Sequence, residues 1–124
     1  MAPNKINILS AAKQQITKVF DPHIVGDVNE SQVKVAKFGK EFDWHSHANE
    51  DEAFFILQGR IAIDFRDATV ELDEGDFIVV PKGCEHRPRS LSLDPVVVMF
   101  EPATTLNTGD MINEKTVTEL KRLS

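Results

Sequence analysis

The chain has 124 residues, enough for one domain, and its 14 basic and 20 acidic residues give a net charge of −6. This balance argues against nucleic-acid and anionic-membrane partners, which need clustered positive charge, so a small molecule is the expected partner. No apolar run approaches the roughly 20 residues of a membrane span, no apolar signal segment follows Met1, and the single cysteine cannot form an internal disulfide. We therefore expect a cytoplasmic protein.

Residues 1–22 are predicted to form an N-terminal arm with one short helix. Ser10 is a candidate N-cap for a helix through residues 11–19, in which Ile16 and Val19 lie three positions apart. The helix should end before Pro22.

Residues 23–102 show short strand-like runs separated by turn residues, at intervals of about 8 to 12 residues. A first hairpin is predicted around Asn29. The predicted strands cover residues 24–28, 32–38, 41–47, 52–58, 60–66, 69–74, 75–81, 85–92 and 95–101. Such a series indicates an all-β fold with an antiparallel sheet, and closing the sheet on itself removes its exposed edges.

The C-terminal residues 103–124 begin with turn-rich sequence. Val117, Leu120 and Leu123 are spaced for one face of a short amphipathic helix. We expect this helix to pack on the barrel.

Three histidines and one glutamate are candidate metal ligands. On a strand His45 and His47 share a face, because residues two apart point the same way. If residues 48–51 form a hairpin loop, Glu52 returns opposite the histidines, within a cross-strand reach of about 5 Å. His86 opens a later strand after a turn that contains proline and glycine.

Three neutral imidazoles and one carboxylate suit a divalent metal such as iron, manganese, nickel, copper or zinc, and leave up to two positions of six open. The plainer interpretation is a surface strand with solvated imidazoles. Three other residues near the cluster, Glu50, Asp51 and Cys84, are alternative ligands that fit less well, because the first two fall in the loop and Cys84 lies in a turn.

Two motifs resemble those of the cupin superfamily. GKEFDWHSHANEDEAFFILQG, from Gly39 to Gly59, resembles the first motif, and GDFIVVPKGCEHRPRS, from Gly75 to Ser90, resembles the second. The resemblance implies a jelly-roll β-barrel with a metal inside, held by His45, His47, Glu52 and His86. Ser90 stands where the second motif usually has asparagine, a position that is not a ligand in the family.

The surroundings of the site follow from strand alternation. Phe54 and Ile56 share the face of Glu52 and should line the cavity. Arg87 and Arg89 point away on an unbroken strand, whereas a bulge would turn them inward as anchors for an anionic substrate. The predicted substrate pocket comprises Phe54, Ile56, Arg87, Arg89 and Ser90.

Three functions remain open at this point. The first is a metal-dependent enzyme acting on a small polar or anionic metabolite, with dioxygenase-like chemistry favoured over isomerisation or epimerisation and Glu52 as the candidate catalytic residue. The chain contains no tyrosine, which excludes a mechanism that needs one. The second is a non-catalytic module that binds a sugar or small acid with the metal as anchor, and the third is a structural metal site. A homodimer is expected.

Overall fold

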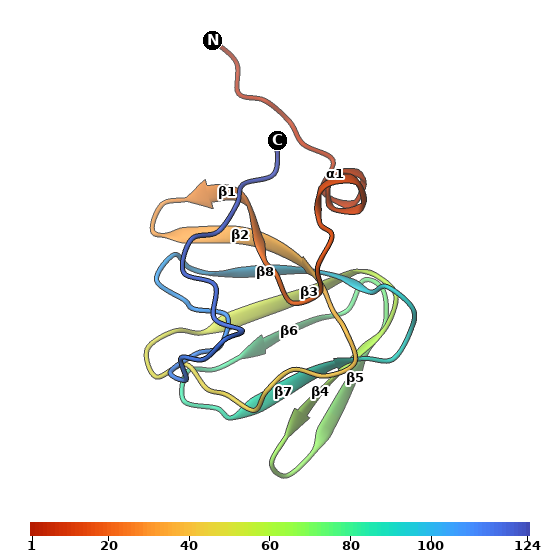
Figure 1. The fold of residues 1–124 in the computed structure, drawn as a ribbon, viewed down its shortest axis with the longest axis vertical. Helices are drawn as coiled ribbons and strands as arrows, with labels where there is room; N and C mark the ends of the chain where they lie inside the picture. Colours follow the sequence, from red (N-terminus) through yellow and green to blue (C-terminus); the bar gives the residue numbers. More distant parts are fainter.

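The computed structural model describes residues 1–124, in which two antiparallel sheets pack face to face and one helix lies beside them (Figure 1). The elements in chain order are α1 (Ile8–Gln15), β1 (His23–Val28), β2 (Ser31–Lys37), β3 (Glu52–Gln58), β4 (Ile61–Phe65), β5 (Thr69–Leu72), β6 (Phe77–Val80), β7 (His86–Ser90) and β8 (Val96–Pro102). The strand order is β1-β2-β8-β3-β6 in the larger sheet and β5-β4-β7 in the smaller. The predicted all-β antiparallel fold is confirmed.

The hairpins form where single residues permit a sharp turn. Asn29, in the two-residue turn between β1 and β2, has a φ of 53°, a left-handed conformation that asparagine tolerates better than most residues. Gly59, between β3 and β4, has a φ of 80°, and a Cβ there would lie 2.6 Å from Ser92 Oγ. These turns fix the register of the strands that carry the site.

The core lies between the two sheets. Strand alternation turns Ile61 and Ile63 of β4 inward and Asp64 outward, and both isoleucines are fully buried. Truncating such an isoleucine to alanine costs about 2–5 kcal/mol. The core cluster comprises Ala36, Phe38, Phe54, Ile56, Ile61, Ile63, Leu72, Val80, Val97 and Met99.

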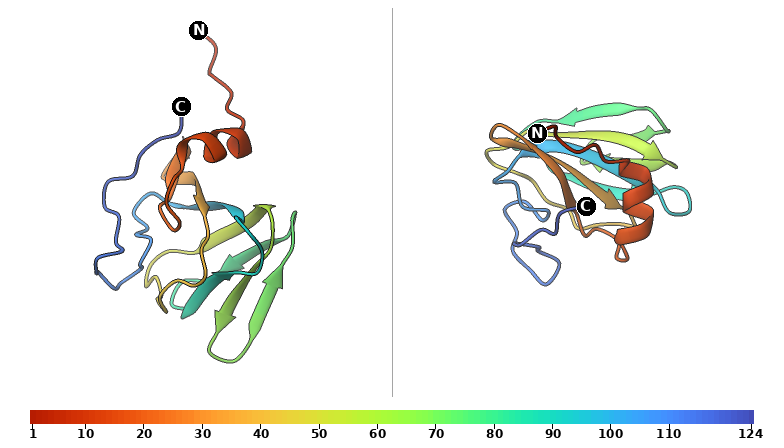
Figure 2. Two further views of the ribbon diagram at one scale, coloured as in Figure 1. Left: turned by 45° about the vertical axis from the view of Figure 1, so that its right-hand side comes forward. Right: turned by 90° about the horizontal axis from the view of Figure 1, so that it is seen from above.

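Helix α1 covers part of the outer face of the larger sheet, as the two views of Figure 2 show. Its small residues Ala11 and Ala12 are buried and pack in one cluster with Val35 of β2 and Val96 of β8. The helix begins earlier than predicted, because the side chain of Asn7, not Ser10, is the N-cap and accepts a hydrogen bond from the Ser10 backbone N–H. No helix has the length and apolar character to span a membrane.

The predicted C-terminal helix is wrong. Residues 117–124 run without helical structure along the edge of the larger sheet, where Ile24 N–H donates to Lys121 O at 2.8 Å and Leu123 N–H donates to Ile24 O at 2.9 Å. Leu123 is buried in the cluster beneath α1. An isolated helix this short is marginal in water, and the unpaired edge of β1 offers the backbone better partners.

The predicted strand at residues 41–47 is also wrong, because this segment makes only an isolated bridge between His45 and His86. It runs alongside β7, with Phe42 N–H donating to Pro88 O at 2.9 Å and His45 N–H donating to His86 O at 3.0 Å. Pro88 has no N–H to return, so a regular ladder cannot continue past it. The result is an irregular loop that carries two of the histidines.

Candidate metal centre

The four candidate ligands come from three segments that meet inside the barrel. His45 and His47 lie on the irregular loop, Glu52 is the first residue of β3 and His86 is the first residue of β7. All four are buried, and their ligand atoms lie within 4.8 Å of one another. The structure thus brings together the four residues predicted from spacing.

The route by which Glu52 reaches the histidines differs from the prediction. Glu52 pairs with Val80 of β6 rather than with the histidine segment, and it faces His86 across the two sheets. Its Oε1 lies 3.4 Å from the Nε2 atoms of both His47 and His86. The site is therefore a contact between sheets, not between the strands of one hairpin.

Backbone carbonyls orient two of the imidazoles. Nδ1 of His45 lies 2.8 Å from Asp43 O, and Nδ1 of His86 lies 3.0 Å from Cys84 O. A carbonyl can only accept, so Nδ1 carries the proton and donates it, which leaves the Nε2 lone pair free. This is the usual support of a metal-binding histidine.

Several ligand atoms have no hydrogen-bond partner although they are fully buried. They are Nδ1 and Nε2 of His47, Oε1 of Glu52 and Nε2 of His86. Unpartnered buried polar atoms are rare and costly, and here Nε2 of His47 and Nε2 of His86 both lie 3.4 Å from Glu52 Oε1. A divalent cation would satisfy these three atoms, so the residues fit the metal that the sequence predicts.

Electrostatics keep the cluster ready to bind a cation. Burial, and then the neighbouring His86, lower the pKa of His45 to about 4, so its imidazole is neutral at pH 7. Burial alone would raise the pKa of Glu52, but its close contacts with Glu101, His47 and His86 lower it well below its ordinary value. A neutral His45 and an ionised Glu52 are the protonation states that metal binding requires.

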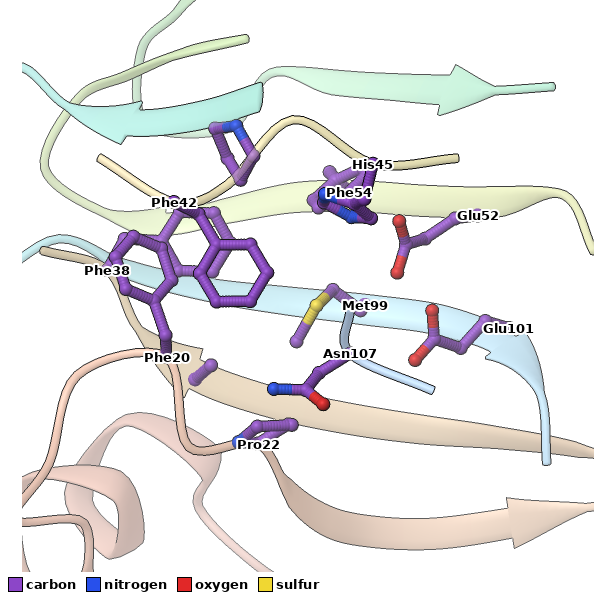
Figure 3. Close-up of a pocket in the computed structure, with 12 residues that line it drawn as sticks. Phe20, Pro22, Phe38, Phe42, His45, Glu52, Phe54, Met99, Glu101 and Asn107 are labelled. Carbon is purple, nitrogen blue, oxygen red and sulfur yellow. The ribbon is translucent and has the colours of Figure 1, made fainter. Parts of the chain in front are cut away.

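A small cavity of about 40 Å³ opens beside His45 and Glu52 (Figure 3). Its lining residues are Phe20, Pro22, Ala36, Phe38, Phe42, His45, Glu52, Phe54, Pro88, Met99, Glu101 and Asn107. Of the five residues predicted to surround the substrate, only Phe54 lines it. Ile56 is fully buried in the core, and Ser90 lies elsewhere on β7.

Arg87 and Arg89 lie on the outer face of the smaller sheet, away from the cavity. Both donate to the Asp64 carboxylate, Arg87 Nη2 at 3.0 Å and Arg89 Nε at 2.9 Å. The guanidinium of Arg87 also lies 5.0 Å from the ring centre of Trp44. Pro88 between them faces inward, so no bulge turns the arginines toward a substrate.

Sequence reasoning missed Glu101 and Asn107 in the cavity wall, and Lys34 behind it. Lys34 Nζ lies 2.9 Å from Glu101 Oε1, and both residues are almost fully buried. Burial, and then the charge of Glu52, raise the pKa of Glu101 well above its ordinary value. The signal was present, because Glu101 lies two residues after the inward-facing Met99.

The C-terminal segment holds the histidine loop in place. Gly109 has a φ of 63°, and a Cβ there would collide with the backbone oxygen of Ser46. Asp110 N–H donates to that same oxygen at 2.9 Å, and Lys115 Nζ lies 2.7 Å from Asp43 Oδ1. This segment therefore presses on the loop that positions His45.

Comparisons with known proteins agree with this geometry. A family model described as "Cupin domain" matches residues 32–102. The uncharacterized protein YdbB of Bacillus subtilis (strain 168) is 36% identical over 88 residues, which are 70% of this chain and 78% of that protein. The acireductone dioxygenase of Bacillus thuringiensis subsp. konkukian (strain 97-27) is 32% identical over 93 residues, which are 67% of this chain and 55% of the dioxygenase.

Solved structures share the fold. A cupin-2 domain protein from Shewanella frigidimarina has a TM-score of 0.74 at 33% identity, covering 78% of this chain and 93% of that one. Protein NMB1881 from Neisseria meningitidis has a TM-score of 0.71 at 31% identity, covering 81% and 100% of the two chains.

Proposed function

The chain belongs to the cupin family, and we propose that it is a metal-dependent enzyme acting on a small molecule, with dioxygenase-like chemistry favoured over isomerisation or epimerisation. The observation that carries the proposal is the buried cluster of His45, His47, Glu52 and His86, whose ligand atoms lie within 4.8 Å of one another. The acireductone dioxygenase relative supports oxygen chemistry, since it is 32% identical over 67% of this chain.

The donor set suits a divalent transition metal. Three imidazoles and one carboxylate favour iron, manganese, nickel, copper or zinc over magnesium or calcium. A metal held there supplies a Lewis acid that polarises a coordinated oxygen atom.

The chain's own residues would perform the remaining tasks. Phe38, Phe42 and Phe54 line the cavity and exclude water, which strengthens electrostatic interactions inside it. His45 is fixed in orientation by its hydrogen bond to the Asp43 carbonyl. Glu52 belongs to both the ligand cluster and the cavity wall, which supports the proposal that it accepts or returns a proton of the substrate.

A purely structural metal is less well supported. A structural site is normally closed by protein ligands, whereas here His45 and Glu52 both face a cavity. In the non-catalytic alternative the metal anchors a bound sugar or small acid that is not converted. The two alternatives differ only in whether the ligand is consumed, which the following experiment measures.

The test is anaerobic reconstitution with Fe(II), followed by oxygen-uptake measurements with a panel of small metabolites. We expect uptake that depends on one of them and is lost in His47→Ala. Ser46→Ala is the matched control, because Ser46 lies between the histidines and is not a ligand. Activity that survives in His47→Ala contradicts the proposal, and saturable calorimetric binding without consumption of the ligand favours the binding module.

We also propose that the protein forms a homodimer through the uncovered part of the larger sheet. Four large apolar side chains on its outer face are exposed, namely Phe55, Phe77, Val79 and Phe100. The strand register places Phe55 opposite Phe77, and Ala53 opposite both Val79 and Phe100, so the four form one patch. Apolar residues that are exposed singly are normal on a protein surface, whereas a contiguous apolar patch such as this one favours self-association. Light scattering should give twice the mass of the chain, and Phe77→Lys should reduce it to one chain.

A further inference from the structure

Only two of the residues that line the cavity beside the candidate metal centre are also exposed to solvent. Phe20 and Asn107 are half-buried, whereas all the other lining residues are buried. Figure 3 shows the ring of Phe20 grouped with those of Phe38 and Phe42, at the end of the cavity away from the acidic side chains. Phe20 and Asn107 therefore form the rim, and the rim residue at the aromatic end is Phe20.

The backbone of Phe20 is strained. Its φ is 55°, in the left-handed region that bulky residues rarely adopt. Such a conformation persists only where the surrounding structure imposes it, and it is commonest at functional sites. Here Lys37 of β2 imposes it twice, because its carbonyl accepts from the Phe20 N–H at 2.7 Å and its Nζ donates to the Ile16 carbonyl at 2.6 Å.

The ring of Phe20 packs closely in this position. Its centre lies 4.8 Å from that of Phe42 and 5.2 Å from that of Phe38, which are separations of favourable aromatic pairs. A Cβ at Gly39 would lie 3.4 Å from Phe20 Cε2, so the absence of a side chain there leaves the ring its space. The ring thus forms a fixed wall at the aromatic end of the cavity.

The other side of the rim is fixed by hydrogen bonds. Asn107 Nδ2 donates to the Lys115 carbonyl at 2.9 Å, and Asn107 Oδ1 accepts from the Val117 N–H at 2.9 Å. Both polar groups of this side chain are therefore engaged by the C-terminal segment. Neither rim residue leaves additional room for a ligand.

The enclosed space is small. The cavity measures about 40 Å³, and a buried water needs about 10–15 Å³, so the space corresponds to about three waters or three linked non-hydrogen atoms. A longer molecule would have to occupy the position of the Phe20 ring.

We propose that Phe20 is a specificity-determining residue, whose ring closes the aromatic end of the cavity and restricts the ligand of the metal centre to short molecules. The inference rests on the proposed function and names its substrate class, in which the buried part of the molecule has about three non-hydrogen atoms. The limit follows from the ring position that the structure shows and requires no movement of the rim.

The experiment titrates the full chain, loaded with Zn(II), with formate, propionate and hexanoate in a calorimeter. The three probes share a carboxylate that can occupy an open position of the metal, and they differ in chain length. Zinc does no redox chemistry, and its content is measured separately in every sample. The matched control is Val19→Ala, because Val19 precedes Phe20 but is 54% exposed and does not line the cavity.

We expect the wild type to bind formate at least about tenfold more tightly than hexanoate, because overfilling a packed interior is costly. Phe20→Ala removes the ring and should raise the affinity for hexanoate at least about tenfold while leaving that for formate within about twofold. Phe20→Gly removes the ring and the backbone strain together, and it should shift the affinities in the same way. Zinc content should be that of the wild type in all variants, and Val19→Ala should keep the wild-type preference.

Two sets of results would contradict the inference in different ways. Zinc bound at about one ion per chain, together with undetectable formate binding, equal affinities for formate and hexanoate in the wild type, or an unchanged preference in Phe20→Ala and Phe20→Gly, overturns this inference alone. Zinc content near zero in the wild type overturns the metal centre, and with it both this inference and the proposed function.

Discussion

Replacing Asp64 by asparagine should destabilise the protein through an interaction that ties β7, and with it His86, to β4. The Asp64 side chain is only 8% exposed. Its carboxylate accepts hydrogen bonds from Arg87 and Arg89, and from the Thr69 hydroxyl at 2.7 Å. The exchange keeps the shape of the side chain but removes the charge that both guanidinium groups need.

The magnitude follows from the number and burial of these contacts. A hydrogen bond to a charged group contributes about 1.5–3 kcal/mol when buried. The Arg87 and Arg89 side chains are 27% and 32% exposed, so water replaces part of what they lose. We therefore expect a loss of roughly 2–3 kcal/mol in the free energy of unfolding, well below the sum of the separate contacts.

The effect should depend on pH with a defined sign. Hydrogen bonding from Arg89, ahead of the other partners, lowers the pKa of Asp64 well below its ordinary value of 3.8. A carboxyl with a lowered pKa in the fold stabilises it above the unfolded-state pKa, and this contribution is lost as pH falls through the folded-state pKa. The difference between wild type and Asp64→Asn should be full at pH 7 and should shrink as the pH falls below about 4.

Urea unfolding of the metal-free protein at pH 7 and at lower pH measures both quantities. The matched control is Asp73→Asn, because Asp73 pairs with Arg60 while its side chain is 67% exposed. An exposed pair of this kind contributes about 0–1 kcal/mol. Equal losses in the two variants, or a loss in Asp64→Asn that does not diminish in acid, would refute the reasoning.

Three further measurements test the candidate centre and the loop that carries its histidines. Metal content by elemental analysis should fall from about one ion per chain to near zero in His45→Ala/His86→Ala, and retained metal would overturn the ligand assignment. In the metal-free protein the His45 ring should titrate by NMR with a pKa of about 4, because burial and then His86 disfavour its charged form, whereas a pKa near 6.5 would contradict its buried setting. Gly109→Val should cost about 1–3 kcal/mol from backbone strain and the collision with Ser46, so an unchanged melting temperature would show that this segment does not press on the histidine loop.

The strands were predictable because their signal is local. Alternation over β4 predicts which residues face the core, and the structure turns Ile61 and Ile63 inward as expected. The histidine spacing was equally readable, since ligand residues must recur at intervals that the chain can bring together. The alternation and the spacing of His45, His47 and Glu52 need only a few neighbouring residues, whereas His86 lies 34 residues beyond Glu52.

The errors arose where distant segments decide the outcome. The segment around His45 has the alternation of a strand, but its partner β7 contains Pro88, and no property of residues 41–47 reveals that neighbour. Likewise Val117 and Leu123 are spaced for a helix, yet the open edge of β1, almost a hundred residues earlier, pairs with this segment instead. The local sequence pattern therefore predicts the wrong secondary structure where an unpaired strand edge or a missing N–H in a distant segment determines the backbone hydrogen bonds.

The pair formed by Lys34 and Glu101 lies between these two cases. Lys34 and Ala36 share the inward face of β2. A buried lysine on a central strand is tolerated only when it is paired, so the alternation predicts an acidic partner for Lys34 without identifying it. Identifying the partner requires knowing that β8 inserts between β2 and β3, where the register places Lys34 opposite Met99 and Glu101 one inward position further along. The alternation that places Phe54 beside Glu52 thus also brings a second carboxyl group to the cavity. That group is supported by a buried lysine rather than by solvent, because Lys34 Nζ lies 2.9 Å from Glu101 Oε1.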